Sequence, residues 1–427
     1  MWHLGEVYSA CLAELGNKVI GIDKNPQVVA NLNKTIVPLA EPKLQEIVKR
    51  NIKNGRLKYT TDFQQLANCN IIWFTTDIPV DKQDRASLNE LFALVKKALP
   101  HMKNGSLIVV SSQLPAGTFA KLSKFIKANR PDFKFDYAYV PENLRLGEAV
   151  DSFMKPSRIV IGTSSDKRRQ ELTKIFKSLT PNIIPVSIAS AEMTKHATNA
   201  FLSTSLSFIY DIADICEAVG ADVVEVSRGL RADERIGEKA YLDASAGFSG
   251  GHLARDLQYL RKIAKSQKID SPVINSVIRK NQGRRKIIFE KISPYLGPFK
   301  DKTVTFFGIT YKSGTPTLAN SLPLAVAKDA LLMGSKIVLC DPWVNPEEIP
   351  AEIPEGKYRY FDDPSKSAKS SHVIICITPW EGLKKLDWRK IGSLMTGPKI
   401  FFDARNYFVA ESRTMEKASI KYIGVGR

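Results

Sequence analysis

The sequence has few cysteines, and their spacing offers no metal site. Five cysteines are scattered over 427 residues, and no two of them form a Cys-x-x-Cys pair. This spacing excludes a metal centre built from ligands that are neighbours in sequence. We therefore expect free thiols buried among apolar side chains, and no bound metal. The cysteines are Cys11, Cys69, Cys216, Cys340 and Cys376.

Long apolar runs, internal repeats and low-complexity segments are also missing. No run of about 18 apolar residues is available for a transmembrane helix, and the N-terminus lacks the charged-then-apolar pattern of a secretory signal. With 44% hydrophobic residues, the chain can fill the cores of two or three domains. The composition thus favours a globular protein of the cytoplasm without a membrane partner.

Acidic residues are outnumbered by basic ones, 44 to 62, which gives a net charge of +18. Such a field attracts nucleic acid, acidic lipid and phosphorylated small molecules. The basic residues are dispersed, however, and no nucleic-acid-binding module accompanies their densest cluster. We interpret that cluster as the solvated face of a long helix and expect no nucleic-acid partner. It consists of Arg279, Lys280, Arg284, Arg285 and Lys286.

The order of apolar patterns predicts an α/β protein with two Rossmann-like, doubly wound domains joined by a central helical region. The predicted parts are 1–188, 189–298 and 299–427, with Pro298–Asp301 as the last linker. Helical periodicity dominates the middle part, as in Ala191–Ala218 and the segment after His252. The clearest strands of the outer parts are Lys18–Asp23, Ile71–Thr75, Leu107–Ser111, Arg158–Gly162, Thr303–Phe307, Lys336–Leu339, Val373–Ile377 and Ile400–Asp403.

The first residues match the later half of a dinucleotide-binding βαβ unit. Gly5 precedes the helical run Val7–Leu15, and the next strand ends at Asp23. In such units a helix N-terminus meets the pyrophosphate, and an acidic residue after the second strand binds the ribose, which favours NAD over NADP. A strand that ends in aspartate is also common without a cofactor. These residues alone leave NAD binding open.

A ten-residue loop carries the most specific pattern. Residues 247–256 read Gly-Phe-Ser-Gly-Gly-His-Leu-Ala-Arg-Asp. This resembles the Gly-Phe-Gly-Gly-Ser-Cys-x-x-Lys-Asp signature of the UDP-glucose/GDP-mannose dehydrogenase family. The resemblance implies that Phe248 and Gly250 meet a sugar, that Asp256 takes up or orients a proton, and that position 252 is the covalent nucleophile. Here His252 replaces the family's cysteine and cannot form a stable thioester.

Two further segments match the family's catalytic residues. Pro141–Gly147 resembles Pro-Glu-Phe-Leu-x-Glu-Gly, which implies acid/base work for Glu142 and substrate contact for Leu144. The alternative for Glu142 is a solvated loop carboxylate.

The segment 191–200 resembles Ala-Glu-x-x-Lys-x-x-x-Asn. The resemblance implies that Lys195 stabilises charge on the substrate oxygen and that Asn199 helps to hold the catalytic water. These two side chains are four residues apart and share a helix face, which could also be merely solvated.

The remaining matches concern the cofactor and the nucleotide. Ser112–Thr118 resembles Ser-Thr-Val-Pro-x-Gly-Thr, which places Gln113 beside the nicotinamide, although a plain turn is the alternative. Arg235, in a match to Asp-x-Arg-Ile-Gly, is implied to reach the partner's substrate across a dimer. Lys312, in a match to Gly-Leu-x-Phe-Lys-x-x-Thr, and Arg405, in a match to Asp-Gly-Arg-Asn, are implied to meet the nucleotide. Ala319 stands where the family has an arginine.

The resemblance covers nearly the whole chain and implies NAD-dependent oxidation of a UDP-sugar or GDP-sugar, bound between the two α/β domains of a homodimer. The product is a uronic acid or only the aldehyde, and His252 could act as a base on the hydrated aldehyde. A catalytically silent nucleotide-sugar-binding protein is the alternative. The family's first strand and first glycine would precede Met1, so we expect a missed start or a truncated gene, with exposed apolar surface and unpaired backbone.

Overall fold

The computed structural model describes residues 3–38, 41–76, 78, 87–142, 144–145, 147–248 and 251–427, with the backbone alone for 251 and 252. The chain forms two compact units, Met1–Ala197 and Thr198–Arg427. The long helix α8 (Ile188–Val219) contributes to both units. The division into three domains at residues 188 and 298 stays a prediction.

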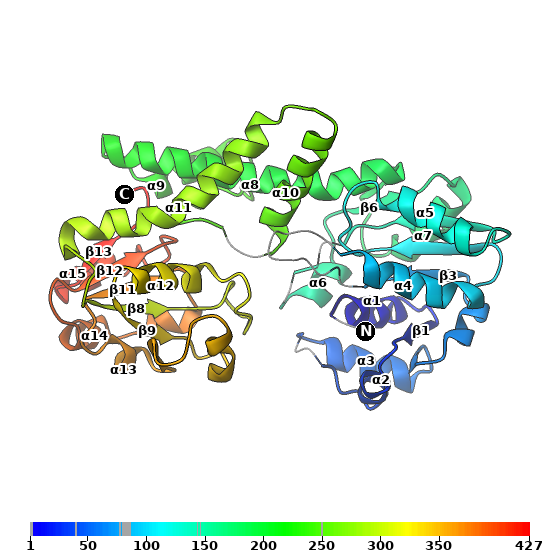
Figure 1. The fold of residues 1–427 in the computed structure, drawn as a ribbon, viewed down its shortest axis with the longest axis horizontal. Helices are drawn as coiled ribbons and strands as arrows, with labels where there is room; N and C mark the ends of the chain where they lie inside the picture. The colour runs from blue at the N-terminus through cyan, green and yellow to red at the C-terminus, as the bar shows by residue number, and fades with distance from the viewer. Residues whose placement is uncertain are drawn as a thin grey trace. The chain divides into compact units, whose positions relative to one another are not determined.

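The first unit is a layer of strands with helices on both faces (Figure 1). All its strand pairs are parallel except β5 with β6. Its strands are β1 (Val19–Ile22), β2 (Leu57–Thr60), β3 (Ile71–Phe74), β4 (Ser106–Val110), β5 (Phe135–Tyr139), β6 (Ile159–Gly162) and β7 (Ile183–Val186). Its helices before α8 are α1 (His3–Glu14), α2 (Pro26–Asn33), α3 (Leu44–Lys53), α4 (Asn89–Ala98), α5 (Thr118–Asn129), α6 (Ala149–Met154) and α7 (Asp166–Phe176), with short 3₁₀ turns at Phe63–Asn68 and Leu99–His101.

Each face of this layer has its own apolar core. Helices α4 and α5 cover one face, and α1, α2, α3, α6 and α7 cover the other. The central strand β4 is buried at every position because both faces are covered, which explains its continuous apolar run. Helix α1 begins at His3, four residues before the predicted helical run, so Gly5 lies inside its first turn.

The layer is broken between β1 and β3. Strand β1 pairs with β2, and β3 begins the separate order β3-β4-β5-β6-β7. The cores nevertheless span both pieces, because Leu57 of β2 shares a cluster with Leu107 of β4, and Ile22 of β1 packs against the cluster on the other face. Among the described residues, β1 and β3 each have one edge without a strand partner.

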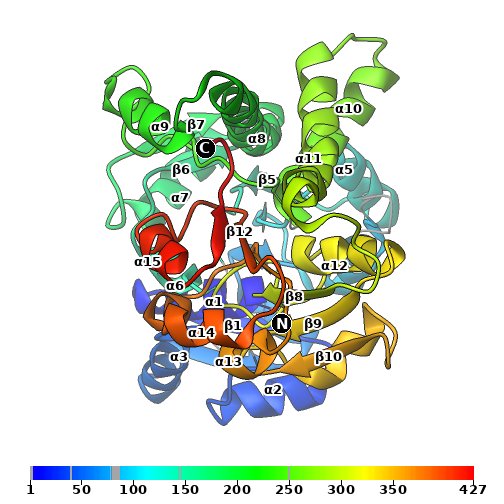
Figure 2. The same ribbon diagram turned by 90° about the vertical axis from the view of Figure 1, so that its left-hand side faces the viewer.

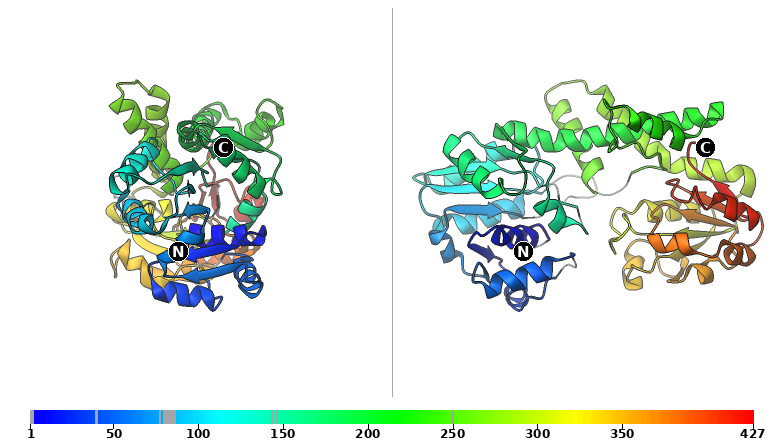
Figure 3. Two further views of the ribbon diagram at one scale, coloured as in Figure 1. Left: turned by 90° about the vertical axis from the view of Figure 1, so that its right-hand side faces the viewer. Right: turned by 180° about the vertical axis from the view of Figure 1, so that it is seen from behind.

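The second unit starts with helices. The later part of α8 is followed by α9 (Val223–Ala232), α10 (Gly251–Ser266) and α11 (Pro272–Leu296), and α8 and α11 lie side by side (Figure 3). The interpretation of the basic cluster as a solvated face is confirmed for Arg279, Arg285 and Lys286, which are exposed, and is wrong for Arg284. Arg284 is buried, and Lys280 and Arg285 are held in ion pairs, because one side of α11 packs against α8 and α12.

A six-stranded parallel sheet completes the second unit, in the order β10-β9-β8-β11-β12-β13 (Figure 2). Helices α13, α14 and α15 cover one face, and α11 and α12 the other. The strands are β8 (Thr303–Phe307), β9 (Lys336–Cys340), β10 (Tyr358–Phe361), β11 (Val373–Cys376), β12 (Ile400–Asp403) and β13 (Lys421–Ile423). The helices are α12 (Leu322–Leu332), α13 (Pro364–Ala368), α14 (Trp388–Leu394) and α15 (Ser412–Lys417), with 3₁₀ turns at Pro346–Ala351 and Glu381–Lys385.

None of the helices in the described part of the chain is both long enough and apolar enough to cross a membrane. All five cysteines are free, and four are buried, but Cys69 is only half-buried, which corrects the prediction for that residue. Burial raises the pKa of Cys11 and of Cys340 to about 12, so neither thiol is primed as a nucleophile.

Candidate active site

In the first unit, Glu142 and Lys195 form a buried ion pair. Glu142 follows β5, and Lys195 points from the start of α8. The Lys195 Nζ atom donates to the Glu142 carboxylate at 3.1 Å and to its carbonyl oxygen at 2.5 Å. The backbone N–H of Leu144 donates to the other carboxylate oxygen at 2.9 Å. The solvated alternative for Glu142 is therefore wrong, since its side chain is about nine-tenths buried.

In the second unit, Asn199 and Asp256 form a second pair. The Asn199 Nδ2 atom donates to the Asp256 carboxylate, which is fully buried on α10. Asn199 lies on α8 one turn after Lys195, as its spacing predicted. The described residues thus bring together Glu142 with Lys195, and Asn199 with Asp256. A carboxylate can accept a proton from a bound hydroxyl, and the hydrogen bond from Asn199 fixes the orientation of this one.

The loop that leads into α10 is held in place at Phe248. This residue is buried, and both of its backbone polar atoms bond the side chain of Asn281 on α11. Gly250 lies outside the described residues, and so does the side chain of His252, whose backbone forms the first turn of α10. The assignment of positions 250 and 252 to the site stays a prediction.

The start of the first unit has groups that suit a dinucleotide. Gly5 is buried in the first turn of α1, and Asp23 follows β1 directly. A helix N-terminus favours phosphate, and a carboxylate at a strand end binds ribose hydroxyls. Glu6 in the same turn is buried, and burial raises its pKa to about 7, so this turn is less negative near neutral pH than an ordinary glutamate would make it. These residues fit NAD.

Gln113 lies in the loop between β4 and α5, and a buried glutamate braces that loop. The Glu192 carboxylate accepts from the N–H groups of Gly117 at 2.7 Å and Phe119 at 3.1 Å. Burial raises the pKa of Glu192, and these two hydrogen bonds oppose the rise. Sequence reasoning gave Glu192 no role, although it stands second in the helix motif that contains Lys195.

A second brace that the sequence did not indicate is Glu41. Its side chain is buried and accepts from the N–H groups of Gly147 at 2.7 Å and Ala149 at 3.1 Å. The His3 Nε2 atom lies 2.7 Å from the same carboxylate. Glu41 therefore fixes the segment that comes after Glu142 and Leu144, from a loop about 100 residues earlier in the chain. No local pattern signals such a contact.

The candidate nucleotide residues lie at one edge of the second sheet. The loop after β8 carries Lys312, and the turn after β12 carries Arg405, with both side chains exposed. These strands flank β11, and the strand order reverses between β8 and β11. Ligands of open α/β sheets bind at the carboxyl ends of strands at such a reversal. Arg405 is oriented by its Nε atom, which donates to the Ile377 carbonyl at 3.0 Å.

Arg235, which is implied to reach a partner's substrate, is exposed as well. Arg235 is 85% exposed and pairs with Asp233 at 2.6 Å. The role of Arg235 at a partner's substrate stays a prediction. The described residues contain no cluster of histidine, cysteine, aspartate or glutamate side chains that could hold a metal ion.

Comparison with known sequences finds three domains of one protein family in successive segments of the chain. Residues 2–180 match the NAD binding domain of the UDP-glucose/GDP-mannose dehydrogenase family, 189–283 its central domain and 305–410 its UDP binding domain. The chain is 31% identical over 427 residues to a UDP-glucose 6-dehydrogenase of Rickettsia conorii (strain ATCC VR-613 / Malish 7), covering 99% of this chain and 97% of the relative. It is 32% identical over 427 residues to the UDP-glucose 6-dehydrogenase TuaD of Bacillus subtilis (strain 168), covering 100% of this chain and 91% of the relative.

Solved structures of nucleotide-sugar dehydrogenases have the same fold as this chain. A UDP-glucose dehydrogenase from Pyrobaculum islandicum superposes with a TM-score of 0.88 at 25% identity, covering 100% of this chain and 96% of that one. A UDP-D-ManNAc dehydrogenase from Pyrococcus horikoshii shares the fold, with a TM-score of 0.84 at 21% identity over 100% of this chain and 97% of that one. The chain therefore belongs to the UDP-glucose/GDP-mannose dehydrogenase family of NAD-dependent nucleotide-sugar dehydrogenases.

Proposed function

We propose that this protein oxidises the primary alcohol of a UDP-sugar with NAD, and that residue 252 is not needed for this first oxidation. The buried Glu142–Lys195 pair is the observation that carries the proposal. Burying two charges costs several kcal/mol per ion, so an ion pair in this position is costly for a site without function. When bound, NAD accepts the hydride that leaves the sugar carbon.

The protein's own residues supply the rest of the chemistry. The Lys195 ammonium pairs with Glu142 and can stabilise negative charge on the substrate oxygen. The alcohol proton needs an acceptor, and the Asp256 carboxylate, held by Asn199, is suited to take it through a water molecule. Lys312 and Arg405 provide the positive charge that a nucleoside diphosphate requires.

Position 252 decides the fate of the aldehyde. Without a thiol no thioester forms, so a second oxidation must start from the hydrated aldehyde, with the His252 imidazole as the base. We expect this second step to be slow, because the hydrate is not covalently held in place. The aldehyde should therefore accumulate.

The test is NADH formation from a panel of UDP-sugars and GDP-sugars, with the product mass determined. One NADH per sugar and a product lighter by two hydrogen atoms is the expected result. Two NADH and a carboxylate would show that the hydrate route is efficient. No turnover alongside measurable UDP-sugar binding would refute the proposal in favour of a silent binding protein.

Matched variants sharpen this test. Lys195→Met should lower the rate of NADH formation by about 100-fold or more, whereas Lys167→Met, at an exposed position of α7, should leave it unchanged. His252→Cys should raise the yield towards two NADH per sugar, since it restores a thiol able to hold the aldehyde covalently. A yield that stays at one NADH in His252→Cys would contradict the role given to position 252.

We also propose a homodimer formed through α8. Phe201, Phe208 and Ile215 recur every seven residues on this helix and are 72%, 49% and 57% exposed. Large apolar side chains in a row along one helix face usually mark an interface. A second copy of the chain fits this surface because, in a twofold dimer, the stripe of one copy packs against the same stripe of the other.

The cytoplasmic location stays a prediction.

A further inference from the structure

The segment 245–248 leads towards α10, and its Phe248 end is fastened to α11 by the side chain of Asn281. Asn281 accepts from the Phe248 N–H at 2.9 Å through Oδ1 and donates to the Phe248 carbonyl at 3.1 Å through Nδ2. One amide thus satisfies both backbone groups of a buried residue, as a neighbouring strand would do.

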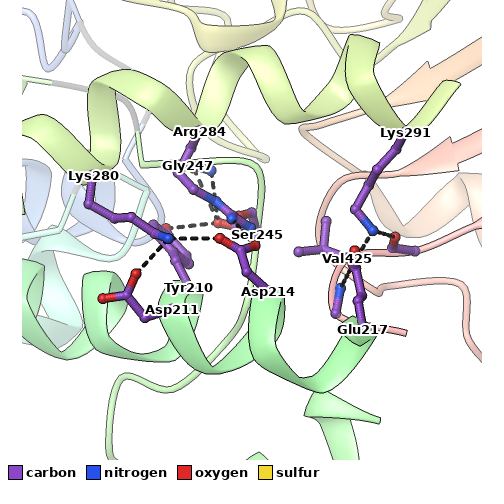
Figure 4. A network of polar contacts seen from close by, with 12 residues as sticks. Tyr210, Asp211, Asp214, Glu217, Ser245, Gly247, Lys280, Arg284, Lys291 and Val425 are labelled. Carbon is purple, nitrogen blue, oxygen red and sulfur yellow. Dashed lines mark hydrogen bonds and ion pairs between the residues drawn. The ribbon is translucent and has the colours of Figure 1, made fainter. Parts of the chain in front are cut away.

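The other end of this segment is held by Arg284, three residues further along α11. Its Nε and Nη2 atoms donate to the Ser245 carbonyl at 3.1 and 3.0 Å, and its Nη1 atom pairs with Asp214 of α8 at 2.5 Å (Figure 4). The Tyr210 hydroxyl lies 2.9 Å from the Ser245 hydroxyl. Residues three apart on a helix lie on the same face, so Asn281 and Arg284 both bind this segment, at Phe248 and at Ser245.

Gly247 lies between Ser245 and Phe248, where the segment approaches α11 closely. Gly247 has a φ of +117°, and a Cβ atom added there would lie 3.2 Å from Asn281 Oδ1 and 3.4 Å from the Cβ of Arg284. A side chain at 247 would be strained by this positive φ, and Asn281 would have to shift by a few tenths of an ångström to make room for it.

We propose that Asn281 is a positioning residue for the active site: by fixing the backbone at Phe248 it sets where α10 begins, and so where His252 and Asp256 stand. Position 252 is four residues beyond Phe248, and Asp256 lies one turn further along α10. This inference rests on the proposed function for its kinetic consequence. Its structural consequence can be measured in a protein that shows no turnover.

Hydrogen exchange at the Phe248 amide in the full-length protein is the structural test. Asn281→Ala removes the acceptor, so this amide should exchange about 10-fold faster or more. Asn281→Asp keeps an acceptor for the N–H and should leave exchange slow. Gln282→Ala, exposed and next in sequence, is the matched control and should change nothing. Unchanged exchange in Asn281→Ala would overturn the proposal.

Kinetics separate positioning from binding. For Asn281→Ala we expect kcat to fall about 10- to 100-fold while the Kd for UDP changes much less, because Arg405 is held by Asp403 and by the Ile377 carbonyl and not by Asn281. Asn281→Asp should keep more of kcat than Asn281→Ala. Equal loss of kcat and of UDP binding in both variants would mean general damage to the unit and would overturn the proposal. If the wild type shows no turnover, the proposed function fails, and the exchange experiment still decides.

Discussion

Buried charged side chains of this protein differ in whether they have partners. Lys195 and Glu142 neutralise each other, and Arg284 is satisfied by Asp214 and the Ser245 carbonyl. Glu6 is different: it is 1% exposed, and its Oε2 atom has no hydrogen-bond partner within the part of the chain that the structure describes. An unpaired buried carboxyl is stable only while it is protonated.

Glu6 should therefore make the first unit sensitive to pH. Its pKa is raised from about 4.5 to about 7 by burial, so its contribution to stability is fully present below about pH 4.5 and is lost as the pH rises through 7. Glutamine stays neutral, so Glu6→Gln should gain about 2 to 3 kcal/mol of unfolding free energy over the wild type when both are taken from pH 5 to pH 8. Urea unfolding at the two pH values measures this gain.

The control for that experiment is Glu46→Gln on α3, where the side chain is exposed. It should show no gain that depends on pH. A gain for Glu6→Gln of the same size at pH 5 and pH 8 would mean that packing, and not ionisation, distinguishes the variant.

At the scale of elements, α8 serves three purposes. Its first turns place Lys195 and Glu192, its middle carries Asn199 and the apolar stripe, and its later turns present Asp211, Asp214 and Glu217 to α11. Different faces of one long helix can do this because residues three and four apart are neighbours while the remaining positions point elsewhere.

The stripe on α8 leads to a prediction about assembly. Phe208→Glu places a charge in the middle of a surface that we expect to be covered, so a dimer should dissociate into monomers. Light scattering during size-exclusion chromatography measures the mass. Ile269→Glu, at an exposed apolar position beyond the end of α10, is the control and should remain dimeric. A monomeric wild type would contradict the assignment, as would a Phe208→Glu variant that stays dimeric.

At the scale of the whole molecule, the two sheets differ in continuity. The second sheet has six strands in one layer, while the first unit is divided between β1 and β3. Hydrogen bonds fix which backbone groups face that break. Val19 and Asp23 donate to the β2 side, and Asn70 and Phe74 accept from β4. Since strand residues alternate in direction, Ile20, Ile22, Ile71 and Trp73 face the break.

These amides should be poorly protected. We expect the N–H groups of Ile20, Ile22, Ile71 and Trp73 to exchange with solvent about 100-fold faster than those of β4, because no strand covers them among the described residues. Amide-resolved hydrogen exchange is the measurement, and the matching β8 residues of the continuous sheet provide the reference. Equal protection in β1, β3 and β8 would show that the break is closed in solution.

The sequence alone predicts those features of the fold and site that depend on residues close together in the chain. The alternating patterns predicted the α/β class and strands such as Thr303–Phe307 and Ile400–Asp403, because apolar period and strand length are local properties. The spacing of Lys195 and Asn199 fixed their common helix face. Family resemblance named Glu142 and Asp256, whose partners the structure then revealed.

Only the tertiary structure shows which side chains hold the backbone around these residues in place. Glu41 meets Gly147, Glu192 meets Gly117, and Asn281 meets Phe248 across 106, 75 and 33 residues of chain. Such contacts join a carboxylate or amide to a backbone N–H. Because every residue except proline has a backbone N–H, no pattern of side chains can predict which residue the carboxylate or amide will bind. The burial of Arg284 within a basic run had the same cause, since the packing of α11 against α8, and not its local charge, set its surroundings.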